Sequence, residues 1–269
     1  MDDSGYLMES EEESIRLEAK TDPAIVGQQA IWAEIRPGAR VADLGCGCGK
    51  TTFLLHQFVQ PGGTAMGVDL SEKRLEYANE NYASEGIEFV RADLLGPLEA
   101  LGSFDFVWIR FVLEYFRSNA AEIVRNASGI LKPGGTMCLI DLDYNCLSHF
   151  GLPERLERAL ARCARILEDK FNFDPYAGRK LYSYLYDLGY KNIAASVSTH
   201  HLIYGSLNDA DAFNFAKKIE MVSRSAGLAL DEYKGGSVEF IKEFTQSFSD
   251  PRRFSYTPLI SVRGQKPSV

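Results

Sequence analysis

The chain has 269 residues, 37 acidic and 29 basic side chains and a formal net charge of −8. That length is enough to bury one full core and to carry insertions. The acidic balance disfavours nucleic acid as a partner, because phosphate binding relies on clustered Lys and Arg, and the longest basic runs are pairs such as Arg252-Arg253.

The N-terminal region before Arg36 predicts two short helices. Glu11 to Lys20 forms the first, and Pro23 to Ile35 the second, which has Pro in its first turn and apolar residues at helical spacing. The acidic start lacks the charged-then-apolar pattern of a signal peptide.

A strand running into alternating glycines follows at Val41–Thr52. Val41 to Leu44 is apolar, the glycines stand at 45, 47 and 49, and a helix resumes by Thr52. Glycines at such a junction let backbone N–H groups approach a ligand closely. The loop therefore predicts binding of a nucleotide or nucleoside.

Two phosphate-binding loops match this segment only in part. A P-loop needs G-x-x-x-x-G-K-[ST]; Gly49-Lys50-Thr51 supplies the second half, but Leu44 stands at the first glycine position. A dinucleotide loop needs G-x-G-x-x-G, and Lys50 occupies its third glycine position, where close helix–strand packing excludes a long side chain.

A third pattern, an acid followed by G-x-G-x-G, matches at Asp43, Gly45, Gly47 and Gly49. This resembles motif I of the class I S-adenosylmethionine-dependent methyltransferases. A carboxylate beside the loop would repel polyphosphate but suits a ligand with an ammonium and a sulfonium. The resemblance implies that Asp43, Gly45, Cys46 and Gly47 contact S-adenosyl-L-methionine.

The second strand, Gly63 to Leu70, ends in an acid at the distance expected for a ribose-binding carboxylate. The two oxygens of Asp69 can accept from both ribose hydroxyls, and Leu70 lies beside them. In the alternative, Asp69 caps the following helix, although Ser71 is better placed for that.

The third strand is expected over Ile87–Leu94. The resemblance implies that Asp93 accepts from the adenine amino group while main chain at Ala92 and Leu94 meets the ring. Alternatively, Asp93 opens a turn before Gly96-Pro97.

The fourth strand, Phe104 to Ile109, is almost wholly apolar, as in a strand covered on both faces. In the resembling family the next segment, Arg110 to Phe116, borders the transferred methyl, so Ile109 and Arg110 are expected at the site. A helix-surface ion pair between Arg110 and Glu114 is the alternative.

Leu131 to Asp141 predicts a helix end, a Pro-Gly-Gly turn and a fifth strand, and this turn is another hallmark of the family. Cys138 to Asp141 also resembles a Walker B strand, which keeps a nucleotide triphosphatase open as an alternative.

Alternating strands and helices predict a Rossmann-like, doubly wound α/β fold. We expect a mostly parallel seven-stranded sheet with an antiparallel last strand and helical lid insertions. Its strand ends would gather Asp43, Asp69, Asp93, Ile109 and Asp141 into one crevice. We predict a single domain over 1–269, divided into an N-terminal lid 1–36, core 37–143, insertion 144–174, core 175–204, lid insertion 205–252 and terminal strand 253–269.

The first insertion is expected to hold an irregular loop at Tyr144–Phe150 and an amphipathic helix at Pro153–Asp169. The arginines of this helix form a cationic face for an acidic substrate or, as we favour, a solvated salt-bridged face; they are Arg155, Arg158, Arg162 and Arg165. A helix at Pro175–Leu188 and a sixth strand at Ile193–Val197 follow.

The second insertion predicts helices at Ala210–Ser225 and Leu230–Ser247, before a last strand at Phe254–Val262. Their aromatic residues either shape an apolar acceptor site or pack the helices. In related enzymes an N-terminal lid lies across the cofactor, so Tyr6 and Arg16 are candidates for contact with its methionine end. The alternative, which we favour for either residue alone, is a solvated surface position.

A general base is needed only when the acceptor carries a proton. Candidates near the expected methyl are Asp141, Tyr144, His149, His200 and His201. Because successive strand residues point to opposite faces, at most one of the two adjacent histidines should face the pocket, and we favour His201 over His200. A structural role is the alternative for both, and the sequence assigns no catalytic base.

The sequence therefore predicts a cytoplasmic enzyme that methylates a small molecule with S-adenosyl-L-methionine. Five cysteines are an odd number for a disulfide framework, no metal-ligand spacing is present, and no apolar stretch could span a membrane. A homodimer stays open. A non-catalytic cofactor-binding subunit or sensor and a P-loop phosphohydrolase are the alternatives.

Overall fold

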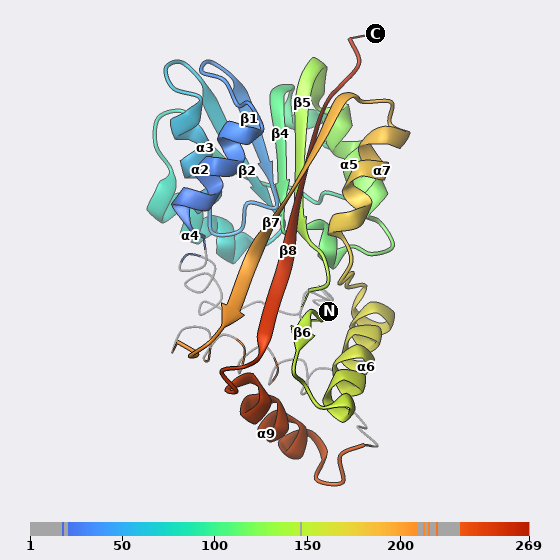
Figure 1. Cartoon of the computed structure of the whole chain (residues 1–269). Coiled ribbons are helices and arrows are strands. Elements are labelled where there is room, and N and C mark those ends of the chain that lie inside the picture. Colours follow the sequence, from blue (N-terminus) through green and yellow to red (C-terminus); the bar gives the residue numbers. More distant parts are fainter. Residues whose placement is uncertain are drawn as a thin grey trace.

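The computed structural model describes residue 18, residues 21–145 and 147–208, residues 212, 215 and 219, and residues 232–268. Within them, eight strands form one sheet in the order β3-β2-β1-β4-β5-β8-β6, and β7 pairs with β8 (Figure 1). β1 to β5 are parallel, and β8 runs antiparallel to β5, β6 and β7. The strands are β1 Arg40–Leu44, β2 Thr64–Asp69, β3 Ile87–Arg91, β4 Phe104–Arg110, β5 Leu131–Leu142, β6 His149–Phe150, β7 Lys191–Tyr204 and β8 Phe254–Gln265.

Helices flank this sheet. They are α2 Pro23–Trp32, α3 Lys50–Phe58, α4 Glu72–Tyr82, α5 Ala120–Gly129, α6 Glu154–Phe171, α7 Leu181–Asp187 and α9 Gly236–Phe248, with short 3-10 turns at Glu99–Leu101, Leu113–Tyr115 and Gly178–Lys180. The predicted Rossmann-like, mostly parallel fold is confirmed, with β6 as an additional strand.

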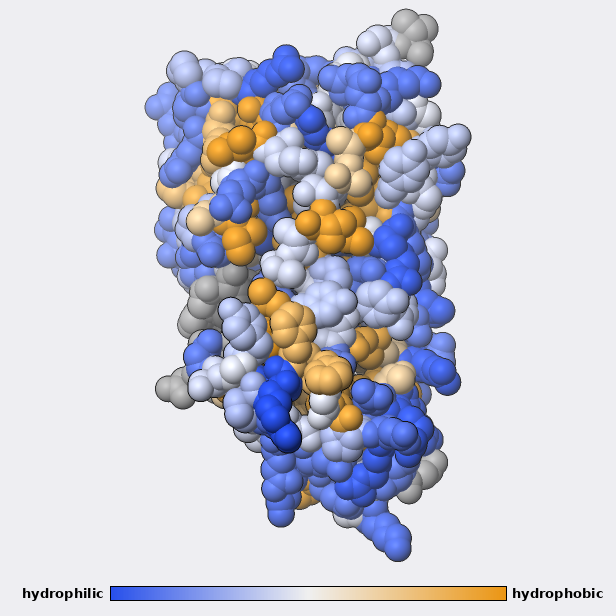
Figure 2. All heavy atoms as spheres, viewed as in Figure 1, coloured by the Kyte–Doolittle hydropathy of each residue, from blue (hydrophilic) through white to orange (hydrophobic). Residues whose placement is uncertain are grey.

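Two regions follow one another along the long strands β7 and β8 (Figure 1). The core holds β1 to β5 and their helices. We call α6, β6, α9, residues 201–204 of β7 and residues 254–257 of β8 the lower lobe. Figure 2, in the same view, shows hydrophilic margins and hydrophobic side chains gathered along the middle of this face.

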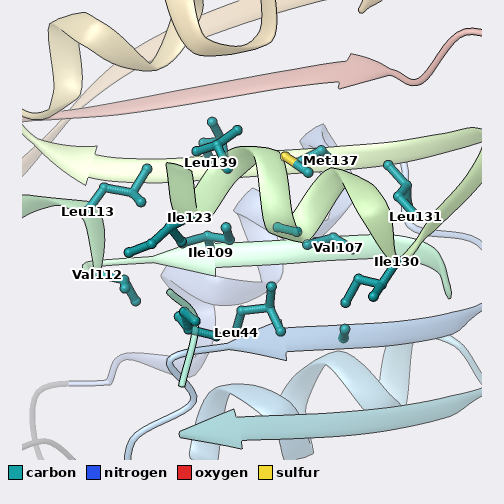
Figure 3. Close-up of a cluster of buried hydrophobic side chains, with 14 of the residues drawn as sticks. Leu44, Val107, Ile109, Val112, Leu113, Ile123, Ile130, Leu131, Met137 and Leu139 are labelled. Carbon is teal, nitrogen blue, oxygen red and sulfur yellow. The ribbon is translucent and has the colours of Figure 1, made fainter. Parts of the chain in front are cut away.

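The core forms where apolar strands are covered on both sides. One buried cluster joins α5 and α7 to β4 and β5, and a second joins α2 and α3 to the opposite face. α5 buries Ala120, Ile123, Val124 and Ala127, the spacing of one helix face. Figure 3 shows Ile123 of α5 beside Ile109 over the face of the sheet, with Val112 and Leu113 in the segment that follows β4. This packing fixes the loop that follows β4.

The lower lobe has a separate apolar cluster. α6 contributes Leu156, Leu160 and Cys163 to it, and α9 contributes Phe240, Phe244 and Phe248. Phe215 and Ile219, which lie in the predicted helix Ala210–Ser225, are also buried there.

Several predicted boundaries were wrong because long-range pairing decided them. The expected loop Tyr144–Phe150 contains β6, whose partner in β8 is more than 100 residues away in sequence. β7 runs to Tyr204, well past the predicted end at Val197, and β3 stops at Arg91, before the predicted end at Leu94.

Two predicted helices begin late. Asp174 accepts from the N–H of Tyr176 (3.0 Å) and so holds a turn where the helix from Pro175 was expected; α7 starts only at Leu181. α9 begins at Gly236 instead of Leu230, after a turn in which Gly236 N–H donates to Tyr233 O (2.8 Å).

Candidate functional site

The glycine loop joins β1 to α3 beneath the segment that follows β4. Gly45 N–H (2.7 Å) and Cys46 N–H (3.0 Å) both donate to Val68 O in β2. Gly45 has φ +79°, and a Cβ there would lie 2.3 Å from Val112 Cγ2. Only glycine permits this close approach. Cys46 is buried, and that burial holds the pKa of its thiol well above its usual range, which suits a small filler without redox activity.

Asp69 ties this loop to the end of β2. Its Oδ2 accepts from Gly47 N–H (2.9 Å) and its Oδ1 from Ser71 N–H (2.9 Å). Ser71 is the N-cap of α4, so the alternative in which Asp69 caps this helix was wrong. Because each carboxylate oxygen has two acceptor directions, Asp69 keeps capacity for ribose hydroxyls. Its ribose role stays a prediction.

Asp43 is buried beside the loop, and its Oδ2 accepts from Thr52 Oγ1 (2.7 Å). Burial raises the pKa of Asp43 to about 7, while the Thr52 hydrogen bond and the charge of Arg110 oppose that rise. A second positive charge next to this carboxyl would favour its ionised form.

Arg110, at the end of β4, meets Gln29 of α2. Arg110 Nε donates to Gln29 Oε1 (3.1 Å), and the guanidinium lies 4.1 Å from the centre of the Phe111 ring. Burial lowers the pKa of Arg110 to about 10, although Asp43 and Asp141 oppose this. Since Arg110 belongs to a strand, the proposed helix-surface pair with Glu114 was wrong.

Gln29 was missed by the sequence reasoning. Its Nε2 is buried and has no hydrogen-bond partner among the described residues. Arg110 and Gln29 thus offer N–H donors next to Asp43, an arrangement that fits the carboxylate and ammonium of an amino acid moiety. The available signal was a glutamine on the same helix face as buried Val26 and Ala30.

The expected adenine end lies beyond β3. Asp93 is exposed; its Oδ1 accepts from Leu95 N–H (2.9 Å) and its carbonyl from Gly96 N–H (3.0 Å), so the expected turn is present. Ala92 N–H donates to Asp69 O (3.2 Å), which links the two strand ends. The adenine role of Asp93 stays a prediction.

Three apolar site candidates have different exposure. Leu70 is 48% exposed, whereas Leu94 and Ile109 are buried in the core cluster. The side chains of Leu94 and Ile109 therefore pack the core, and only their backbone could meet a ligand.

Lys50 does not project freely from the loop. Its Nζ donates to Glu18 O (2.9 Å) and lies 3.1 Å from Glu18 Oε1, which also accepts from Tyr82 OH (2.6 Å). A P-loop lysine would have to reach phosphate instead, so this arrangement argues against the P-loop reading.

Asp141 is poorly suited to act as a base. It is fully buried, and its oxygens accept from Glu114 N–H (3.1 Å) and Leu142 N–H (2.9 Å). Burial, with Glu114 nearby, raises the pKa of Asp141 well above its usual range. Because a protonated carboxyl cannot take up a proton, this direction of the pKa shift, together with burial, argues against Asp141 as a base.

Tyr144 and His149 lie in different settings. Tyr144 is 42% exposed, and Arg179 lies 4.5 Å from the centre of its ring while pairing with Asp143 (2.8 Å). His149 is in β6 of the lower lobe, where its Nδ1 and Ser255 Oγ are 2.9 Å apart and its ring meets Phe244 edge-on.

The two adjacent histidines lie together, contrary to the expectation that alternation separates them. A β-bulge in β7 between Thr199 and His201 breaks the period of two, and their ring centres are 4.1 Å apart. His200 contacts Phe111, in the segment after β4, and His201 contacts Phe215 in the lower lobe. Of the two histidines, His200 is therefore the one that contacts the segment following β4.

The arginine face of α6 is salt-bridged, as favoured. Arg155 pairs with Glu239 (3.1 Å) and Glu243 (2.9 Å) of α9, and Arg158 with Glu154 (3.3 Å). Tyr6 and Arg16 lie outside the described residues. Within the described part of the chain, no three His, Cys, Asp or Glu side chains group as metal ligands, and no helix has the length and apolar character needed to cross a membrane.

Known proteins resemble this chain in sequence and in fold. Residues 42–139, from β1 into β5, match the model of a family described as a methyltransferase domain. A demethylmenaquinone methyltransferase from Lactococcus lactis is 27% identical over 215 residues, which cover 75% of this chain and 71% of that relative.

Solved structures share the fold at low identity. A methyltransferase candidate from Bacillus halodurans aligns over 91% of this chain and 99% of its own, with a TM-score of 0.56 and 19% identity. Phosphoethanolamine N-methyltransferase 2 from Haemonchus contortus, solved with S-adenosyl-L-methionine, aligns over 91% of this chain and 52% of its own, with a TM-score of 0.54 and 17% identity.

Proposed function

We propose, from the premise that this chain is a class I S-adenosylmethionine-dependent methyltransferase, that it transfers a methyl group to a small-molecule acceptor. The proposal rests on the arrangement at one edge of the sheet. There the glycine loop donates a hydrogen bond to Asp69, and Arg110 bonds to Gln29 close to Asp43. Along this one edge of the sheet, Asp69 offers hydrogen-bond acceptors for a ribose. Arg110 offers a positive charge and Asp43 a carboxyl group for the two charged ends of an amino acid moiety.

Each of these residues has a part in holding S-adenosyl-L-methionine. Asp69 would accept from the ribose hydroxyls, and Asp93 from the adenine amino group. Arg110 and Gln29 would donate to the carboxylate of the methionine moiety, and ionised Asp43 would stabilise its positive charge. When bound, the cofactor supplies a methyl group on a sulfonium, which is already an activated leaving group.

The protein's contribution is then placement. The acceptor atom must approach the methyl carbon in line with the breaking S–CH₃ bond, whose electron pair stays on sulfur. Well-oriented reactants gain roughly 7–11 kcal/mol from such positioning. The segment after β4, fixed by Leu113 in the core and by Phe111 against His200, would border that line.

We further propose an apolar ring-bearing acceptor. The lower lobe follows this edge along β7 and β8 (Figure 1), and it holds a buried cluster of aromatic side chains that includes Phe244 and Phe248. The Lactococcus relative is named for methylation of a quinone, demethylmenaquinone. Free buried thiols at Cys46, Cys48, Cys138 and Cys163 support a reducing cytoplasm as the setting.

Two measurements test the proposal in sequence. Calorimetric titration should show binding of S-adenosyl-L-methionine and of its demethylated product, and no binding of either at millimolar concentration would remove the proposal. Labelled cofactor should then pass its methyl to demethylmenaquinone or a short-chain analogue, with phosphoethanolamine as the comparison acceptor. Binding without transfer to any compound of a cell extract would instead support the non-catalytic sensor.

A further inference from the structure

The outer face of the sheet in the lower lobe carries an aromatic surface that the proposed reaction does not use. Phe150 of β6, Phe254 of β8 and Tyr204 of β7 are register partners in one row across three strands. Leu202 and Tyr256 form the next row. We call these five residues the aromatic patch.

The opposite faces of the same strands are already buried. His149, Ser255 and Ile203 alternate with the patch residues, and they point toward the apolar cluster formed with α6 and α9. A half-buried antiparallel sheet normally shows polar residues on its outer face. Here the outer positions are aromatic or aliphatic.

The patch is exposed in the single chain. Exposed fractions are 71% for Phe150, 64% for Tyr204, 49% for Leu202, 43% for Phe254 and 41% for Tyr256. The rings of Tyr204 and Phe254 stack at 6.2 Å, and Phe254 and Tyr256 lie 6.1 Å apart. Figure 2 shows hydrophobic side chains over β6 and the lower ends of β7 and β8. A contiguous exposed apolar surface of this kind marks an interaction site.

We propose that a second copy of this chain covers the aromatic patch, packing sheet face on sheet face about a two-fold axis. A large aromatic side chain has about 150–250 Å² to bury, and these five residues are between 41% and 71% exposed, so covering them removes about 500 Å² per copy. The two copies together bury about 1,000 Å², the lower limit for a specific interface. An uncharged patch can face itself without repulsion, as an isologous interface requires.

Net charge disfavours two other classes of occupant for the aromatic patch. The chain carries a net charge of −8, which opposes anionic lipid surfaces and nucleic acid. The neighbouring Arg252 is 88% exposed at its side chain, but it pairs with Asp250 (2.6 Å). Tyr and Phe are the residues that protein interfaces favour.

The test compares matched tyrosines in the full chain. Tyr204→Asp places a charge in the patch, whereas Tyr186→Asp changes a tyrosine of identical exposure, 64%, on α7. Mass measurement by light scattering and analytical ultracentrifugation should give twice the 30.0 kDa chain mass for the wild type and for Tyr186→Asp. Tyr204→Asp should raise the dimer dissociation constant at least about tenfold.

A second pair of variants distinguishes loss of the interface from a folding defect. Phe150→Asp should also yield monomer, and Val238→Asp, at a 75% exposed position of α9, should remain dimeric; circular dichroism confirms that each variant is folded. A wild type that stays monomeric at about 100 μM, or a dimer unaffected by both patch variants, overturns the proposal. A wild-type monomer that co-sediments with phosphatidylcholine vesicles, and loses this on Phe150→Asp, would assign the patch to a membrane surface and also overturn it.

Discussion

At the carboxyl edge of β1 and β2, polar side chains form hydrogen bonds with groups close by in sequence. The lower lobe is instead held together by contacts between residues that are far apart in sequence. Asp43 meets Thr52 nine residues away, and Asp69 meets Ser71 two residues away. In the lobe, Arg155 meets Glu243 across 88 residues and His149 meets Ser255 across 106.

This difference separates two tasks. The edge is built on strands whose apolar faces are covered by helices, so its polar groups stand on rigid supports, a requirement for a precise ligand geometry. The lobe's α6 and α9 pack around their own aromatic cluster, and that cluster does not include side chains of β1 to β5. We therefore expect changes in the lobe to alter acceptor use and lobe stability while cofactor binding persists.

The largest effect that we predict is a loss of stability confined to the lower lobe. Phe244→Ala removes a ring that is 2% exposed and contacts Phe248 and His149, so it should lower the free energy of unfolding by about 3–5 kcal/mol. Urea titration followed by circular dichroism measures this. Both tryptophans, Trp32 and Trp108, pack in the core cluster, so tryptophan fluorescence reports on the core separately.

The matched control is Val238→Ala, a 75% exposed position on the same helix, which should stay within about 0.5 kcal/mol of the wild type. If Phe244→Ala shifts the fluorescence transition as much as the circular dichroism transition, or removes cofactor binding, the two regions form one cooperative unit and the comparison fails.

The next largest effect concerns cofactor binding at the carboxyl edge of β1 and β2. Asp69→Ala should weaken S-adenosyl-L-methionine binding by about 1.5–3 kcal/mol, the worth of hydrogen bonds to a charged group. Part of the loss would come through Gly47, whose N–H bonds to Asp69. Calorimetry with Glu72→Ala, which removes a nearby exposed carboxylate, provides the control. An unchanged dissociation constant in Asp69→Ala would place the ribose elsewhere.

The same contrast explains what the sequence could predict. Asp43, the glycines and Asp69 were found because their spacing is local and each stands where a strand ends. The mostly parallel sheet likewise follows from alternating strands and helices. A Gly47→Val substitution would not test the pocket cleanly, because Gly47 has φ +55° and a branched residue there would strain the backbone.

What the sequence could not predict depends on contacts between distant segments. β6 exists through pairing with β8, and the bulge that brings His200 beside His201 follows from the register of β7 on β8. Gln29 gains meaning only when α2 is packed near the end of β4. Neither periodicity nor motif spacing contains such information.

A third prediction uses the titration of Asp43. With a pKa of about 7, raised by burial, this carboxyl is protonated at lower pH, and a protonated acid does not stabilise a cationic ligand. Cofactor affinity should therefore rise with pH, by up to about tenfold per unit below pH 7, and level off above it. Calorimetry between about pH 5.5 and 8 measures this. Asp43→Asn should flatten the profile; an affinity that falls with rising pH contradicts the assignment.

The smallest effect that we predict tests whether Asp43 is the group that titrates. Thr52→Val keeps the buried volume but removes the 2.7 Å hydrogen bond that favours ionised Asp43. The pKa of Asp43 should rise, so the midpoint of the affinity profile should move to higher pH while the affinity on the high-pH plateau changes little. Thr51→Val, at the neighbouring position in α3, serves as the control and should leave the midpoint in place. Because the lobe does not contact Asp43, Phe244→Ala should leave this midpoint unchanged, and a shift there would show that the two regions communicate through the loop after β4.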